Sequence, residues 1–292
     1  MTDKVKAAVY MSLSSLSFAV MAAMVRLSGD IPLIEKVFFR NLVSLLIAFF
    51  MLRKTKYSFF GKKGNTIWLV LRSAFGLLGV ILYFFSVDHI SMADSSMLNR
   101  LSPFFVTVFA AFFLKERITK IEIPALIIVF GASLLIVKPS FNVQVLPYMA
   151  GIIAAAGGGA AYAIIRFLRN RENPLTIVFF FSFFSVVSLL PFLFIDFKIP
   201  NLEQAMYLIL IGVFAAGGQF GLTYGYKYGR ASEASLYSYL NVVFAAFIGF
   251  ILWMEVPDLL SIISSIIIIL VSVFLVFYKG KAAPPEKLDI AE

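Results

Sequence analysis

The sequence predicts an all-α membrane protein with ten transmembrane helices arranged as two inverted five-helix repeats. Three observations support this prediction. The 292 residues are 61% hydrophobic and only 14% charged, far from the composition of an ordinary soluble domain. Ten apolar runs are long enough to cross a bilayer, and the second five resemble the first five. A soluble fold would have to bury nearly all of these apolar residues, whereas lipid accepts them on every side of a helix.

A spanning helix needs about 20 apolar residues, and the runs of this length are separated by polar, charged, Gly or Pro residues. The first run follows Lys4 and Lys6 and has no cleavage site, so we predict a retained helix rather than a signal peptide. The predicted spans, in order, are residues 5–27, 32–52, 66–88, 92–114, 120–138, 147–168, 174–195, 202–227, 231–253 and 258–279.

The positions of Lys and Arg predict the orientation of these spans. The loop RKTKYSFFGKKGN, after the second span, is strongly basic, and placing it in the cytoplasm puts most of the 25 basic residues on that side. Both termini are then cytoplasmic, in a multi-pass protein of the plasma or inner membrane. The net charge of +9 follows from this asymmetry and favours contact with anionic lipids. Binding to nucleic acid is not predicted.

An internal repeat divides the chain. A shift of 139 residues aligns MADSSMLNRLSPFFVTVFAAFFLKE with ASEASLYSYLNVVFAAFIGFILWME and pairs Glu116 with Glu255 and Gly79 with Gly218. Five helices per repeat force the two repeats into opposite orientations, as in secondary transporters that bind substrate between the halves. The predicted units are repeats 1–140 and 147–280 and a disordered cytoplasmic tail, 281–292.

Two motifs at the ends of predicted helices resemble a known family. FLKERIT closes the fourth helix and GASLLIVKPS ends the fifth, and with the two five-helix halves they resemble the EamA-domain branch of the drug/metabolite transporter superfamily over residues 5–280. LWMEVPD departs from the family pattern, which usually has a Gly-Glu step followed by a basic residue. The resemblance implies a basket of ten helices around a central cavity, lined mainly by the first, third, fourth, sixth, eighth and ninth helices. It also implies transport of small organic solutes.

Polar side chains within the spans are the candidate substrate contacts, because each costs free energy unless it faces protein or water. In the fourth span, Asn99, Arg100 and Ser96 form part of a broad polar side that is predicted to face inward. Some of the candidates could instead bond neighbouring helices. The predicted substrate-binding residues are Tyr83, Ser96, Asn99, Arg100, Gln219, Thr223, Tyr226, Tyr237, Ser238, Asn241 and Arg40.

The arginines differ in predicted depth. Arg40 and Arg100 each lie about eight residues inside the outer end of a span, or about 12 Å, where snorkelling to the surface is awkward. Their similar depth predicts two guanidiniums that face one cavity, although Glu35 or Asp94 could neutralise one of them. A structural role is the favoured alternative for Arg40. Arg72 lies nearer the inner surface and is predicted to snorkel.

Arg100 suggests the class of substrate. No acidic residue lies near the middle of a predicted span, and the only histidine, His89, lies at an outer loop. An arginine without a resident counter-ion is satisfied by a carboxylate through paired hydrogen bonds. We therefore predict a secondary-active or facilitative carrier of small zwitterionic or anionic metabolites, with amino acids or related carboxylates first. No cofactor or metal is expected. Arg100 aligns with Tyr239, so the repeat alone does not explain the charge.

Other functions stay open. The 33 phenylalanines could line a cavity for cationic, nucleobase-like or lipophilic compounds, and a duplicated helical chain also fits a channel or a lipid scramblase. An intramembrane hydrolase would need a Ser–His or paired-Asp arrangement, which a chain with one surface His and no Cys disfavours, so we do not predict an enzyme. The sequence does not decide transport direction, coupling ion, or monomer against homodimer.

Overall fold

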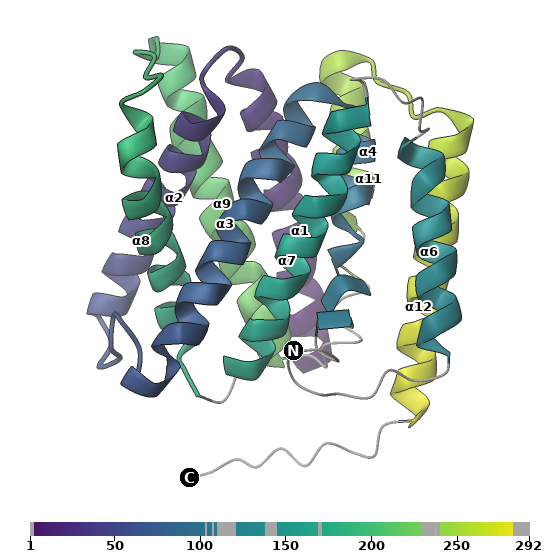
Figure 1. Cartoon of the computed structure of the whole chain (residues 1–292), viewed down its shortest axis with the longest axis horizontal. Coiled ribbons are helices and arrows are strands. Elements are labelled where there is room, and N and C mark those ends of the chain that lie inside the picture. Colours follow the sequence, from purple (N-terminus) through teal and green to yellow (C-terminus); the bar gives the residue numbers. More distant parts are fainter. Residues whose placement is uncertain are drawn as a thin grey trace.

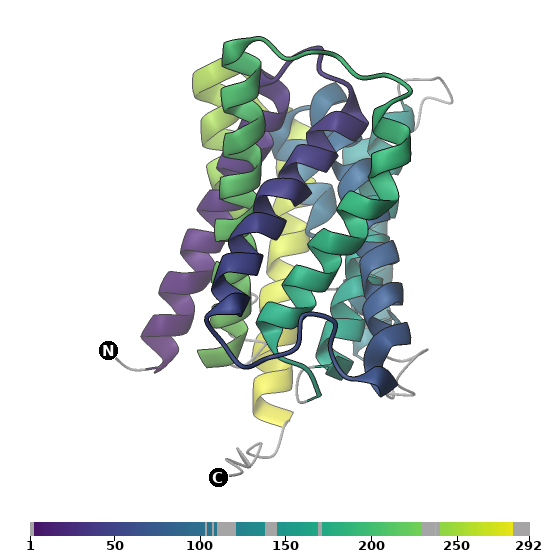
Figure 2. The same ribbon diagram turned by 90° about the vertical axis from the view of Figure 1, so that its left-hand side faces the viewer.

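The described part of the chain is helical and contains no strand. In the computed structural model the helices stand side by side as an upright bundle (Figures 1 and 2). The structure describes residues 3–102, 104–106, 108–109, 121–137, 145–168, 171–228, 237 and 240–282. The elements are α1 (Asp3–Leu27), α2 (Leu33–Arg53), the 3-10 helix η1 (Lys63–Asn65), α3 (Thr66–His89), α4 (Met92–Asn99), α6 (Glu122–Val137), α7 (Leu146–Leu168), α8 (Pro174–Leu193), α9 (Leu202–Tyr228), α11 (Leu240–Trp253) and α12 (Leu259–Ala282).

Several helices are suited to a bilayer. Within the described residues, five have the length and hydropathy needed to cross it, and these are Val5–Leu27, Lys63–His89, Leu146–Ile165, Pro174–Leu193 and Leu202–Leu222. The bounds of α3, α7 and α9 agree with the predicted spans to within one residue at each end. Glu116 and the tail beyond Ala282 lie outside the described residues.

The predicted continuous helix over 92–114 is wrong in its middle. α4 ends at Asn99, Arg100 caps it, and helical structure resumes at Ser102. The break follows from the chemistry of proline. Pro103 has no N–H to donate to the carbonyl of Asn99, one turn earlier. The Ser102 hydroxyl donates to that Asn99 carbonyl instead, at 2.6 Å. Arg100 therefore lies at a helix end within the bundle and not on a regular helix face.

The two repeats interlock. α1 packs along α9 and α3 packs along α7, while α2 packs against α8, α4 against α11 and α6 against α12. The shift of 139 residues that relates the repeats matches α1 with α7 and α3 with α9. The α1–α9 contact is therefore equivalent to the α7–α3 contact when the two repeats are exchanged. Each of the other three contacts joins a helix to its own repeat mate. Every one of these contacts therefore crosses from one repeat to the other.

Glycines let α3 and α7 approach to backbone contact. A Cβ atom on Gly79 would lie 3.1 Å from the carbonyl oxygen of Ala154 and 3.1 Å from the nitrogen of Gly158. These are backbone atoms of α7, so they cannot turn away as a side chain would. The repeat mate Gly218 in α9 lies against the ring of Phe18 in α1 instead. Gly79 and Gly218 therefore lie at equivalent helix contacts, but Gly79 meets backbone atoms and Gly218 meets an aromatic ring.

Glu255 joins the ends of three helices. Its carboxylate forms an ion pair with Arg26 at the end of α1 and accepts a hydrogen bond from the backbone N–H of Met92 at 3.0 Å. A carboxylate at this place also interacts favourably with the amino-terminal dipole of α4. The Arg26 guanidinium carbon lies 4.7 Å from the centre of the Trp253 ring. α1, α4 and α11 are therefore held together at one end of the bundle.

We expect Gly79→Ala to destabilise the protein, because the added methyl group would force the α3 and α7 backbones apart. Overpacking of this kind costs about 1–3 kcal/mol, and the check is the thermal unfolding midpoint of the detergent-purified protein. Gly131→Ala in α6 is the matched control, since a Cβ atom there would meet nothing within 4 Å. Equal midpoints for the two variants would contradict the close crossing of α3 and α7.

Candidate functional site

Arg100 lies where α4, α11 and α1 meet. Its Nη2 donates to Oδ1 of Asn241 at 3.1 Å. Asn241 is 1% exposed, and its Nδ2 donates to the carbonyl of Ser15 in α1 at 2.9 Å. Because the amide nitrogen is used on α1, the amide oxygen must face the guanidinium. Asn241 therefore fixes the position of Arg100 and leaves its positive charge intact.

Tyr83 and Ser96 complete the same region from α3 and α4. The Tyr83 side chain lies close to Ser96 and within electrostatic range of Arg100, and both Tyr83 and Ser96 are buried. The Ser96 hydroxyl and the Arg100 Nε have no hydrogen-bond partner. We call Tyr83, Ser96, Arg100 and Asn241 the Arg100 site. Four residues that the sequence predicted as substrate contacts are thus brought together from three helices.

Ser15 of α1 is a residue of this region that the sequence analysis missed. Besides accepting from Asn241, it donates from its hydroxyl to the carbonyl of Tyr237 at 3.0 Å. The serines of MSLSSLSF within the first apolar run were the available signal, since polar residues inside a span need partners. Ser15 ties α1 to both Asn241 and the segment before α11.

Ser15 links the Tyr237 backbone carbonyl to Asn241, and the described interactions join none of the other predicted contacts to the Arg100 site. Asn99 and Gln219 are half-buried, and the Tyr237 residue is 39% exposed. Ser238 lies outside the described residues, as do the side chains of Thr223 and Tyr226.

Arg40 is placed elsewhere, together with Arg72. The guanidinium carbon of Arg40 lies 5.4 Å from the centre of the Phe181 ring in α8, and that of Arg72 lies 4.0 Å from the same centre. The prediction that Arg72 snorkels is wrong, because the residue is 3% exposed and its side chain packs inward on α8. The described contacts join Arg40 to Arg72 and not to Arg100. The pairing of two arginines on one ring was not predicted.

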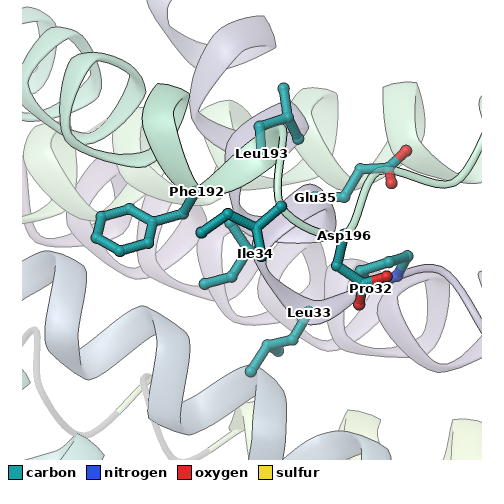
Figure 3. A pocket seen from close by; sticks show the side chains of 8 residues that line it. Pro32, Leu33, Ile34, Glu35, Phe192, Leu193 and Asp196 are labelled. Carbon is teal, nitrogen blue, oxygen red and sulfur yellow. The ribbon is translucent and has the colours of Figure 1, made fainter.

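A surface hollow between the start of α2 and the end of α8 is a different feature (Figure 3). Figure 3 shows the Phe192 ring on one side of it and the carboxylates of Glu35 and Asp196 on the other. None of the predicted contacts and no basic side chain lines this hollow, so it is not the candidate site. Its lining residues are Pro32, Leu33, Ile34, Glu35, Phe192, Leu193, Ile195 and Asp196.

Comparison with known proteins gives relatives along nearly the whole chain. The pseudopaline exporter CntI of Pseudomonas aeruginosa (strain UCBPP-PA14) is 32% identical over 277 residues, which are 94% of this chain and 97% of that protein. The human protein named solute carrier family 35 member G1 is 26% identical over 266 residues, 85% of this chain and 72% of its own. A crystal structure with 16% sequence identity has a TM-score of 0.66, covers 95% of this chain and 99% of its own, and shares the fold.

The family follows from these matches and from the helices. The EamA-like transporter family matches the chain twice, over residues 5–138 and 145–278. These two matches cover both halves of a chain whose described part includes five helices suited to cross a bilayer, and the cited relatives are named as an exporter and a solute carrier. The chain is therefore a multi-pass membrane protein that belongs to the EamA-like transporter family of the drug/metabolite transporter superfamily.

Proposed function

We propose that the protein is a secondary-active or facilitative transporter of small zwitterionic or anionic organic metabolites, with amino acids and related carboxylates as the first candidates. The observation that carries this proposal is the guanidinium of Arg100. It is held by the neutral amide of Asn241, its Nε has no partner, and no ion pair among the described residues includes it. A positive charge inside a membrane protein calls for a compensating negative charge.

A carboxylate ligand fits the chemistry of the Arg100 site. The planar guanidinium can donate two parallel hydrogen bonds to one carboxylate. The hydroxyls of Ser96 and Tyr83 offer further donors beside it, and the aromatic face of Tyr83 can pack on the rest of a small metabolite. We also propose substrate contacts at Asn99, Gln219 and Tyr237, because polar side chains within a span need a partner.

We place this site in a ten-helix protein with two inverted repeats around a central cavity. In this proposal residues 1–140 and 147–280 form the repeats, the tail 281–292 is disordered, and both termini are cytoplasmic in the inner membrane. The basic loops face anionic lipid on the cytoplasmic side. The exchange of α1–α9 and α3–α7 contacts when the repeats are swapped supports a symmetric mechanism of alternating access.

In this mechanism the outer ends of the helices open and close. Among the described residues, three ion pairs lie on this side, Arg26 with Glu255, Lys36 with Asp88 and the more exposed Lys198 with Asp30. Lys36 is 1% exposed, and its Nζ lies 2.7 Å from Asp88 Oδ2. We propose that the Arg26–Glu255 contact must break for substrate to pass the outer side. The exporter named among the relatives favours outward transport of the substrate.

Loss of the Arg100 charge should weaken binding of carboxylates. A hydrogen bond to a charged group contributes about 1.5–3 kcal/mol, so we expect Arg100→Gln to lower the affinity about 10- to 100-fold. The measurement is a thermal-shift titration of the purified protein with amino acids, dicarboxylates, amines and nucleobases. Asn241→Asp should act in the same direction, because its carboxylate would neutralise Arg100 and compete with the ligand.

Arg53→Gln is the control, since Arg53 is an exposed arginine in the last turn of α2. It should leave ligand affinity unchanged. Uptake of radiolabelled ligand into proteoliposomes should be lower for Arg100→Gln and Asn241→Asp than for the wild type and Arg53→Gln. Stabilisation of the wild-type protein by amines alone would overturn the proposed substrate class and favour a carrier of cations. Flux that neither saturates nor shows counterflow would instead favour a channel.

The outer ion pair gives a second prediction. The chain has no cysteine, so Ser96→Cys introduces a single thiol at a residue that is 0% exposed. Adding Arg26→Gln should speed its labelling by an impermeant thiol reagent from outside about fivefold, because a partly exposed ion pair contributes up to about 1 kcal/mol. Leu202→Cys, at a residue 90% exposed, should react at the same rate with and without Arg26→Gln. Unchanged labelling of Ser96→Cys would refute the proposed role of this ion pair in closure.

A further inference from the structure

Two arginines are buried against one aromatic ring at the junction of α2, α3 and α8. Arg40 is 2% exposed and Arg72 is 3% exposed. Their guanidinium carbons lie 5.4 Å and 4.0 Å from the centre of the Phe181 ring, so two like charges share one aromatic contact and repel each other. The protein therefore encloses two like charges within a bilayer-spanning bundle, where the energetic penalty for charge is high.

Much of the hydrogen-bonding capacity of the two guanidiniums is unused. Arg40 donates from Nη1 to Oδ1 of Asn41 at 2.6 Å. Nε of Arg40 and both Nε and Nη1 of Arg72 have no partner. The ion pairs formed within the described parts of the chain include neither arginine. A buried charge that is neither paired nor fully hydrogen-bonded is strongly unfavourable.

No carboxylate in the described part of the chain pairs with either arginine, whereas neutral hydrogen-bond donors lie near them. Tyr162 of α7 lies within electrostatic range of both guanidiniums. Ser185 lies one helical turn from Phe181 on the same side of α8, is fully buried, and its hydroxyl has no partner. The ring contacts offset only part of the cost of burying two cations. The local chemistry is therefore that of a receptor for an anion.

Gly76 lets the α3 backbone lie close to Phe181 and Arg72. A Cβ atom on Gly76 would lie 3.1 Å from a ring carbon of Phe181 and 3.6 Å from Nη1 of Arg72. A side chain at this position would therefore occupy space next to the unpartnered Nη1 atom. The burial of both arginines leaves no exposed guanidinium for the charged end of a large organic molecule or lipid. The burial of both guanidiniums therefore favours a single inorganic ion over a larger anion.

We propose that Arg40 and Arg72 bind a small monovalent inorganic anion of the size of chloride between α2, α3 and α8. The anion accepts hydrogen bonds from the unpartnered guanidinium nitrogens and reduces the repulsion between the two arginines. This site is separate from the Arg100 site, and it does not depend on which metabolite is carried. Bound anion stabilises the packing of α2 and α3 on α8.

The test uses the purified full-length protein and chloride itself. Binding of radioactive chloride is measured with increasing unlabelled chloride, and thermal unfolding is followed as sodium gluconate is replaced by sodium chloride at constant ionic strength. We expect saturable binding and an unfolding midpoint that rises with the logarithm of chloride concentration. Bromide should substitute for chloride, and gluconate, which is too large to enter, should not.

Variants locate the ion. Arg72→Gln and Arg40→Gln should each weaken chloride binding at least tenfold and flatten the dependence of the midpoint on chloride. Arg171→Gln is the matched control, because the Arg171 guanidinium carbon lies 3.9 Å from the centre of the Phe167 ring in an exposed residue. It should bind chloride like the wild type.

Several results would overturn this proposal. The absence of saturable chloride binding to the wild-type protein does so without any variant, even where Arg72→Gln fails to fold. Equal loss of binding in Arg171→Gln would show a nonspecific effect of charge. Loss of chloride binding in Arg100→Gln, with retention in Arg72→Gln, would place the ion at the Arg100 site. Failure of the metabolite assays alone leaves the chloride result standing, so the two proposals are tested separately.

Discussion

The structure depends on one constraint, which is that a polar group inside the bilayer needs a partner, either in the protein or in a ligand. Ser102 supplies a hydroxyl to the carbonyl that Pro103 cannot serve, and so permits the break in α4. Asn241 uses both ends of its amide, one on α1 and the other on Arg100. Polar contacts between helices thus hold Arg100 in place, and the groups that remain unpartnered mark where a ligand can act.

The same constraint connects the repeats to function. The main helix contacts cross from one repeat to the other, and the Arg100 site draws residues from both, with Tyr83 and Ser96 from the first and Asn241 from the second. A movement of one repeat against the other therefore changes the distance between Arg100 and Asn241. In the proposed alternating-access mechanism, a site built across the repeats would respond directly to the relative motion of the repeats.

Sequence reasoning predicted the positions of most described helices because apolar runs of spanning length have clear ends, as at α3, α7 and α9. It also selected Tyr83, Ser96, Arg100 and Asn241, since polar residues within a span are few. It could not predict the surroundings of Arg72, because depth along a helix does not tell which helix packs against that face. Nor did it anticipate the break at Arg100, although Pro103 was visible, because a proline can also be tolerated within a kinked transmembrane helix.

The central claim is that Arg100 recognises a carboxylate. It is tested most directly by comparing the binding of an amino acid with that of its carboxamide, which has nearly the same shape but lacks the negative charge, to the wild-type protein and to Arg100→Gln. The claim predicts that the wild-type protein prefers the carboxylate about tenfold or more and that Arg100→Gln loses this preference. An equal preference for the carboxylate in both proteins would contradict the claim, because the group that recognises the carboxylate would then be a residue other than Arg100.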